Sequence, residues 1–226
     1  MPLVSSLMVS VLVEPLEERG LPRARWVEGL GLDEHALDPN GLIEWDAAMR
    51  LVDRAAEHLG GPEGLESLTF SLQAQRFGVG PAVGIVIRPQ RLYQMIGRWM
   101  TDHASLPLRT RVEVRGERVT VDLSLAEGVR SSQALWYGLR GMFRRIPVEL
   151  GASEPQVLST VGDREARFDI TVARPGLGTR IRRSFATIGG SRRLIAEFQN
   201  QQLELRRRLD ELRNQSHALR ASEARN

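Results

Sequence analysis

The first half of the chain carries apolar residues at the three- and four-residue spacing of amphipathic helices. The pattern starts in Leu3–Arg19, and Gly20, Leu21 and Pro22 then interrupt it. Four further stretches have the same spacing in stronger or weaker form: Ala24–Gly29, Ala47–Leu59, Glu63–Phe77 and Pro89–His103. These segments predict an N-terminal layer of helices.

After Pro107 the period changes from that of a helix to that of a strand. Arg109–Arg115 and Arg118–Leu125 alternate apolar and polar residues, and the Gly116-Glu117 pair between them predicts a tight hairpin. A helix over Ser131–Leu150 and two more strands follow, Val157–Thr160 and Ala166–Val172. The order of helices followed by β-β-α-β-β predicts an α+β fold with a small antiparallel sheet.

The last part of the chain has a heptad repeat. Its a and d positions are Ile195, Phe198, Gln202, Leu205, Leu209, Leu212, Ser216 and Leu219. This spacing predicts a long C-terminal helix that forms a parallel coiled coil with a second copy, because the stripe extends past the domain and needs a surface to bury against. The alternative is a solvated, arginine-rich helix packed on its own domain.

These patterns divide the chain into three parts. Residues 1–175 are expected to form the globular α+β domain, 176–192 a linker with a joint at Gly189-Gly190, and 193–226 the coiled-coil helix. The helix termini of a parallel dimer stay in register, so a change of packing in the globular domain would pass along the coil.

Composition removes several classes of protein. The 226 residues include no cysteine, which excludes disulfides and thiolate metal sites and favours a cytoplasmic location. They also include no lysine, which excludes a phosphate-binding loop with its lysine, a Schiff base and a Ser-x-x-Lys nucleophile. No window is long and apolar enough to span a bilayer, so no membrane association is expected of these residues.

Charge is divided unevenly along the chain. Residues 1–173 hold 19 arginines against 23 acidic residues, whereas residues 174–226 hold 12 arginines against 5. The basic tail raises the question of nucleic acid, but aromatic residues do not interleave with the arginines and no recognition-helix motif occurs. Nucleic-acid binding is therefore not predicted.

No residue cluster predicts catalysis or a metal site. The glycine-rich segment Phe77–Ile87 lacks the spacing of a nucleotide-binding loop. The four histidines are far apart and lack the His-x-x-x-His spacing of a zinc helix, and Ser131-Ser132 suits a helix N-cap better than a nucleophile. We expect no enzyme activity in this chain.

The large apolar residues on elements that should converge between helices and sheet are the candidate ligand site. Methionine and aromatic side chains suit an adaptable lipophilic site. Ordinary core packing is the competing explanation for the same residues, which are Phe77, Tyr93, Ile96, Trp99, Met100, Trp136, Leu139, Met142 and Phe143.

Two families resemble this sequence over most of residues 1–173. Leu12–Asp38, Glu44–Leu59 and the helix after Gly64 resemble the N-terminal, arabinose-binding-like region of AraC-type regulators. The order of helices and β-β-α-β-β, to about Val172, resembles the haem-nitric-oxide-binding and vinyl-reductase-type sensor fold. The resemblance rests on leucine, glycine and acidic spacings, and it implies a domain that senses a small ligand.

The resemblance also bears on cofactors and on the downstream partner. Haem-binding members use a histidine on the helix before the first hairpin, where this chain has Leu92 or Tyr93, and a Tyr-x-Ser-x-Arg motif that is absent, so no cofactor is expected. The end of the chain, Leu219–Arg225, resembles the linker that enters PAS domains of bacterial histidine kinases and diguanylate cyclases.

These observations lead to one favoured function and two alternatives. We expect a cytoplasmic, homodimeric sensory input domain that binds a small apolar ligand and signals through its coil to a PAS-linked kinase or cyclase module in the same protein. The alternatives are a dimerisation and scaffold domain without a ligand, and an enzyme of the vinyl-reductase-like lineage.

Overall fold

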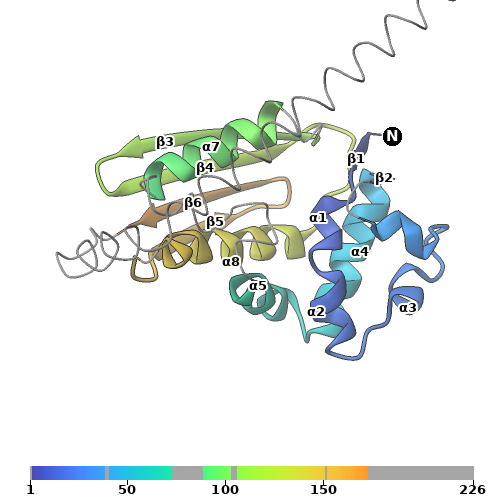
Figure 1. Cartoon of the computed structure of the whole chain (residues 1–226). Helices are drawn as coiled ribbons and strands as arrows, with labels where there is room; N and C mark the ends of the chain where they lie inside the picture. Colours follow the sequence, from blue (N-terminus) through green and yellow to red (C-terminus); the bar gives the residue numbers. More distant parts are fainter. Residues whose placement is uncertain (1, 39–40, 73–88, 103–105, 151, 173–226) are drawn as a thin grey trace, which may run out of the picture. The chain divides into compact units, whose positions relative to one another are not determined.

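A computed structural model of the chain describes residues 2–38, 41–72, 89–102, 106–150 and 152–172 (Figure 1). The predicted linker and coiled coil of residues 176–226, and with them the dimer positions Ile195 to Leu219, lie outside these residues, as does the glycine-rich segment Phe77–Ile87. In the part described, no helix is long and apolar enough to cross a membrane.

The N-terminal segment is not the single helix that its apolar spacing predicts. Strand β1 (Leu3–Ser5) pairs antiparallel with β2 (Leu42–Glu44), and two short helices follow β1: α1 (Leu7–Ser10) and α2 (Val13–Glu17). Helix α3 (Arg23–Val27) and the 3-10 turn η1 (Glu34–Leu37) come next. The predicted helical layer therefore also contains a two-stranded sheet.

Tertiary bonds explain why the first residues form a strand. The Trp45 backbone N–H donates to the Pro2 carbonyl at 2.9 Å, and the Ser6 N–H donates to the Gly41 carbonyl at 3.0 Å. The Ser6 hydroxyl is fully buried and donates to the carbonyls of Asp38 and Gly41. These partners lie more than 30 residues away, so the local pattern around Leu3 cannot reveal them.

Helix α4 (Trp45–His58) and helix α5 (Pro62–Ser71) follow the predicted pattern closely. They are separated by Gly60 and Gly61, which have φ angles of 84° and 124°, a region that glycine adopts readily. Pro62 occupies the first turn of α5, where its missing N–H costs nothing. The sequence predicted that this helix continues to Phe77, but it ends at Ser71, and Leu72 has an extended backbone. Residues 73–77 lie outside the described part.

The hairpin and its preceding helix form as predicted. Helix α7 (Pro89–Asp102) leads to β3 (Leu108–Arg115) and β4 (Arg118–Leu125), which pair antiparallel through a two-residue turn at Gly116-Glu117. Helix α8 (Gln133–Glu149) begins at Ser132, whose side chain accepts from the Leu135 N–H at 3.2 Å, the cap that the sequence suggested. Strands β5 (Gln156–Val161) and β6 (Glu165–Thr171) complete the sheet.

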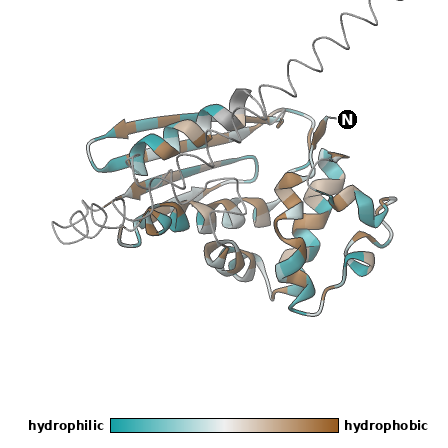
Figure 2. Cartoon of the chain, viewed as in Figure 1, coloured by the Kyte–Doolittle hydropathy of each residue, from teal (hydrophilic) through white to brown (hydrophobic). Residues whose placement is uncertain are grey.

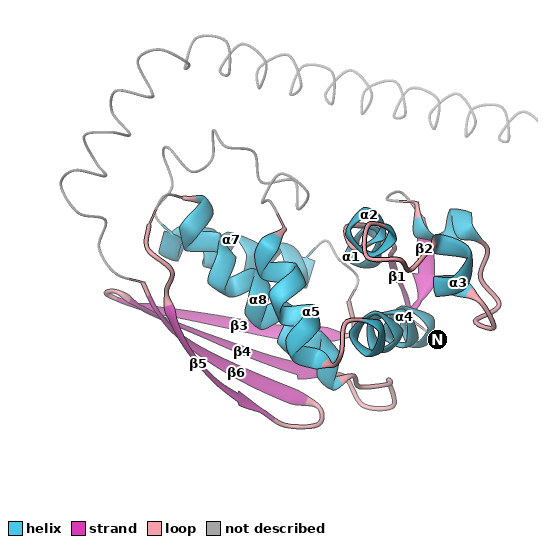
Figure 3. Ribbon diagram, turned by 90° about the horizontal axis from the view of Figure 1, so that it is seen from below, coloured by secondary structure: helices cyan, strands magenta, loops and turns pink. Residues whose placement is uncertain are grey.

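The four-stranded sheet has the order β3-β4-β6-β5, and every neighbouring pair is antiparallel. Helices α7 and α8 cover one face, and α5 packs on α8 (Figure 3). Brown apolar and teal polar positions alternate along the strands (Figure 2). Val121, Leu123 and Phe168 are among the residues buried on the helix-covered face. The structure confirms the α+β class and the β-β-α-β-β order.

Helix α8 crosses α5 at two glycines. A Cβ atom built on Gly141 would lie 2.3 Å from the Glu66 backbone carbonyl and 2.2 Å from the Thr69 hydroxyl, whereas one on Gly138 would be 3.5 Å from its nearest neighbour. The Thr69 hydroxyl donates to the Gly138 carbonyl at 2.9 Å. The close approach of the two helices thus depends on Gly141 much more than on Gly138.

Candidate functional site

Seven of the nine predicted ligand-site residues lie in the hydrophobic core on helices α7 and α8, and we call the layer between these helices and the sheet the interlayer. Tyr93, Met100, Trp136 and Phe143 are buried there, and Ile96, Leu139 and Met142 are partly buried against the same core. Phe77 and the side chain of Trp99 lie outside the described part. Seven of the nine predicted residues are therefore placed in one apolar cluster.

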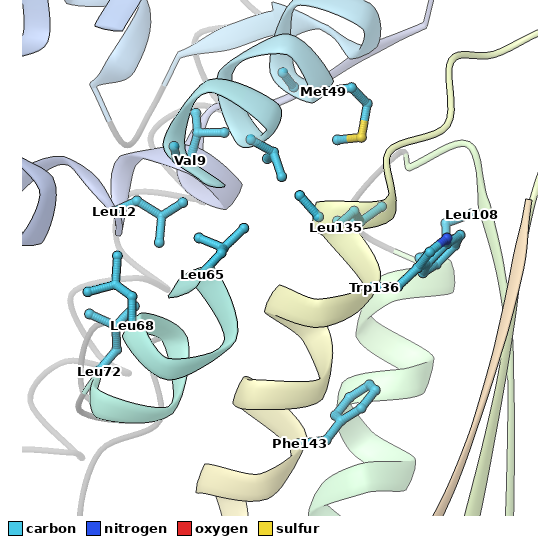
Figure 4. Close-up of a cluster of buried hydrophobic side chains, with 14 of the residues drawn as sticks. Val9, Leu12, Met49, Leu65, Leu68, Leu72, Leu108, Leu135, Trp136 and Phe143 are labelled. Carbon is cyan, nitrogen blue, oxygen red and sulfur yellow. The ribbon is translucent and has the colours of Figure 1, made fainter. Parts of the chain in front are cut away.

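Three aromatic rings stack edge to face through the interlayer. The ring of Tyr93 on α7 lies 6.0 Å from that of Phe143 on α8, which lies 5.2 Å from that of Phe168 on β6. Figure 4 shows Trp136 and Phe143 on the side of α8 that faces the sheet, with Trp136 next to Leu108. These contacts join helix α7, helix α8 and the sheet in one packed layer.

The Tyr93 hydroxyl has a structural partner. It donates to the Phe143 carbonyl at 2.6 Å, and that carbonyl lacks its usual helical donor because the residue four positions later is Pro147, which has no N–H. Burial raises the pKa of Tyr93, so the hydroxyl keeps its proton at all ordinary pH values. The Tyr93 hydroxyl therefore replaces the missing helical donor to Phe143 and is not free to bind a ligand.

Trp136 differs from the other two tryptophans whose side chains the structure describes. The indole N–H of Trp26 donates to the Leu51 carbonyl at 2.8 Å, and that of Trp45 donates to the Arg130 carbonyl at 2.7 Å. Trp136 is equally buried, yet its Nε1 has no hydrogen-bond partner. A buried donor without a partner costs about 1–3 kcal/mol, so this group calls for an explanation.

Thr110 supplies a second buried polar atom of this kind. Its hydroxyl oxygen has no hydrogen-bond partner, and its methyl group would be 3.6 Å from a Cβ on Gly97, so the residue faces α7. Leu108, the neighbour of Trp136, precedes Thr110 on the same face of β3, about 7 Å along the strand. The two unpartnered polar atoms therefore belong to one layer.

The interlayer offers no charge to a ligand. The buried polar and charged residues that the structure describes are Ser6, Glu66, Thr69 and Ser132, and none of them lies on α7 or in the four-stranded sheet. An ionised group placed in such a layer would lose its hydration without gaining a counter-ion. An ionised ligand is therefore not expected between the described residues of this layer.

The sequence did not identify Thr110 or Phe168 as parts of this region. Both lie on strands in which apolar and polar residues alternate. Thr110 and Phe168 occupy the positions that point to the apolar face. The signal that could have singled out Thr110 is a hydroxyl at an inward position between Leu108 and Val112.

A second cluster of charged groups joins α5, α8 and the chain after α8. Glu66 accepts from Arg140 and from Arg144, the latter at 2.7 Å, although only 8% of its side chain is exposed. Arg144 also pairs with Glu154, and Arg140 donates to the Ser159 hydroxyl at 3.1 Å. Every group in this cluster has a partner, so we assign it to stability.

Glu66 should make stability depend on pH. Burial alone raises the pKa of the Glu66 carboxyl, but the hydrogen bonds and charges of Arg140 and Arg144 outweigh burial, and the net pKa is lowered. The stabilising effect of the Glu66 carboxylate is therefore complete above the pKa of an unfolded-state glutamate and is lost as pH falls through the lower, folded-state pKa.

We expect Glu66→Gln to cost about 2 kcal/mol at neutral pH and to flatten the acid limb of the stability profile. Chemical denaturation measured between neutral pH and mild acid tests this. Glu154→Gln is the control, because the Glu154 side chain is 45% exposed and should contribute little. Parallel acid limbs for wild type and Glu66→Gln would contradict the assignment.

Among the residues that the structure describes, no group of three or more histidine, aspartate or glutamate side chains could hold a metal ion. No family model matches the sequence, and no curated protein matches it either.

Solved structures do match, and three of them are H-NOX domains. A structure that probes haem distortion in the H-NOX family has a TM-score of 0.55 at 13% identity and covers 76% of this chain and 97% of the other. A structure on the mechanism of H-NOX activation (TM-score 0.52, 12% identity) and a doubly substituted H-NOX variant (0.52, 11%) each cover 76% of this chain and 96% of theirs. At these identities the likeness shows the fold alone, which is the haem-nitric-oxide-binding-like fold.

This finding corrects the expectation about cofactors. The sequence led us to expect none, yet the chain shares its fold with H-NOX domains, a family in which the function of haem distortion has been probed. The prediction was wrong because it weighed only two motifs and not the fold, which matches that of these domains over 76% of the chain.

The described residues nevertheless do not supply a ligand for haem iron where the resemblance implies one. On α7, Leu92 has no donor atom, and the Tyr93 hydroxyl is protonated and bonded to Phe143. The free polar atom of Trp136 is an N–H donor, which cannot coordinate a metal. Among the described residues, the Trp136 Nε1–H can therefore supply a hydrogen bond but not a coordination bond.

Proposed function

We propose that this chain is the sensory input domain of a signalling protein and that it binds a small, neutral, mostly apolar ligand in the interlayer. The observation that carries the proposal is the buried indole N–H of Trp136, which has no partner although Trp26 and Trp45 have theirs. A ligand carbonyl or ether oxygen at Nε1 would remove the cost of the unpaired donor on binding.

The fold supports a sensor in a further way. The matched structures are H-NOX domains, one of them described in terms of its activation, and their architecture spans 76% of this chain. Helix α8 carries Trp136 and also contacts α4, α5 and β5, so a shift of α8 on ligand binding reaches several elements.

The predicted C-terminal coiled coil would carry the signal to a partner module. The heptad from Ile195 to Leu219 would pair two copies in parallel, and the Leu219–Arg225 segment would lead into a PAS-linked kinase or cyclase module of a cytoplasmic protein. A ligand-induced change of packing in the globular domain would reach that module through the paired helices.

Ligand binding can be tested with short 2-alkanones and the alkanes of matching length. Purified full-length chain should show a higher melting temperature with an alkanone than with the alkane, since only the alkanone offers an acceptor to Trp136. Trp136→Phe should weaken alkanone binding about tenfold, the equivalent of one lost hydrogen bond. Trp45→Phe is the matched control: it removes a paired indole N–H, so it should lower stability without changing alkanone affinity.

Two results would overturn the proposal. If no alkanone stabilises the chain and native mass spectrometry finds no copurified compound, the ligand-free dimerisation and scaffold function replaces it. Haemin is added in a parallel titration followed by its absorbance. Stoichiometric haemin binding that Trp136→Phe leaves unchanged would replace the neutral ligand with the cofactor of the structural neighbours.

A further inference from the structure

The two edges of the four-stranded sheet differ in how they are protected. Strand β3 carries four charged residues in its eight, Arg109, Arg111, Glu113 and Arg115. Strand β5, at the opposite edge, has the sequence QVLSTV, with no charged residue, proline or glycine. Natural proteins normally guard an edge with charges, proline or a bulge, so β5 lacks the usual protection.

The alternation of hydrogen bonds between β5 and β6 shows which backbone groups of β5 point away from the sheet. The Gly162 N–H donates to the Glu165 carbonyl at 2.8 Å, and antiparallel bonding alternates from there. Gln156, Leu158 and Thr160 therefore bond to β6, and the backbone groups of Val157, Ser159 and Val161 point outward. No hydrogen bond described in the structure engages these three backbone positions.

Strand β5 also has an exposed apolar side chain. Leu158 is 64% exposed, on the sheet face opposite the helices. Its cross-strand neighbour on β6 is Asp169. The Asp169 carboxylate accepts a hydrogen bond from Thr120 and pairs with Arg167, so the surrounding face is polar. Leu158 is the one large apolar residue of the described sheet that is more than half exposed.

From these observations we propose that β5 pairs antiparallel with β5 of a second copy of this chain, so that two four-stranded sheets become one of eight strands. Ser159 is the middle one of the three residues whose backbone groups point outward. A two-fold axis at Ser159 pairs all three: Ser159 with Ser159 of the other copy, and Val157 with Val161 of the other copy. If the register is shifted by two residues, only two of these three positions in each strand find a partner. The same operation on β3 would bring arginines together, which is unfavourable.

This register also covers the exposed leucine. Leu158 of each copy lies opposite Thr160 of the other as a non-hydrogen-bonded pair, the arrangement in which side chains approach most closely. The contact is a single pair of six-residue strands, smaller than a standard interface, so we expect weak association. The coiled coil predicted for residues 193–226 would reinforce it by raising the effective concentration. The proposal does not depend on a ligand.

Cysteine crosslinking tests the pairing, because the chain has no cysteine of its own. The double variant Leu158→Cys/Thr160→Cys should form a covalent dimer on mild oxidation, since each cysteine faces its counterpart at disulfide distance. Leu158→Cys alone and the double variant Gln156→Cys/Thr160→Cys have no facing pair in this register and should crosslink much more slowly. The test holds whether or not the C-terminal helices also associate.

A second measurement uses substitutions that introduce charge. Leu158→Lys should remove the concentration-dependent protection of the Ser159 amide from hydrogen exchange, whereas Leu42→Lys, at a residue 67% exposed on β2, should leave it unchanged. The proposal is overturned if the three cysteine variants crosslink at equal rates. It is equally overturned if the Ser159 amide exchanges at the same rate at every protein concentration.

Discussion

Replacing Gly141 with alanine will lower the free energy of unfolding by about 3 kcal/mol. The added methyl group would lie 2.3 Å from the Glu66 carbonyl oxygen, a backbone atom that can move only if α5 moves. The higher helix propensity of alanine returns about 1 kcal/mol at most. Equilibrium unfolding in urea measures the difference.

Gly138→Ala is the matched control for that change. Both glycines lie in α8 and both face α5, but the new methyl on Gly138 would be 3.5 Å from the nearest atom, an ordinary contact. We expect Gly138→Ala to be neutral or to stabilise the chain by up to about 1 kcal/mol. Equal losses in the two variants would mean that helix crossing does not set the cost.

Tyr93→Phe will destabilise the chain by about 2 kcal/mol, although it removes only one oxygen atom. The Phe143 carbonyl would be left in an apolar layer with neither the Tyr93 hydroxyl nor a helical N–H. Urea unfolding again gives the magnitude.

The role of Pro147 in this loss can be tested with a double-mutant cycle. Pro147→Ala restores an N–H four residues after Phe143, so Tyr93→Phe should cost less in that background than in the wild type. If the cost is the same in both backgrounds, the Phe143 carbonyl is not the group that needs the hydroxyl.

The sequence predicted most of the sheet and the helices around it because their patterns are local. The Gly116-Glu117 turn, the Ser132 cap and the strand alternation each depend on residues a few positions apart. Strand β1 was missed because its partners, Gly41 and the Leu42–Glu44 strand, are distant in sequence. A short apolar run of this kind suits a helix or a strand equally well.

The candidate site shows the same division between local and distant information. The sequence named Tyr93, Trp136 and Phe143 as large residues on elements expected to converge, and all three are buried in the structure. The sequence could not show that the Tyr93 hydroxyl is engaged by Phe143 while the Trp136 N–H is not. That distinction depends on which carbonyl lies opposite each donor, and on a proline four residues after Phe143.

The strand order β3-β4-β6-β5 has a consequence for how the chain is made. Strand β6, the last described strand to leave the ribosome, occupies an interior place between β4 and β5. Until β6 emerges, the edge of β4 is unpaired and β5 lacks its partner strand. Aggregation-prone strand edges are therefore exposed while translation continues. A gene fragment that stops before Glu165, where β6 begins, would leave the polypeptide permanently in that aggregation-prone condition, and any shortened version made for expression should extend beyond Thr171.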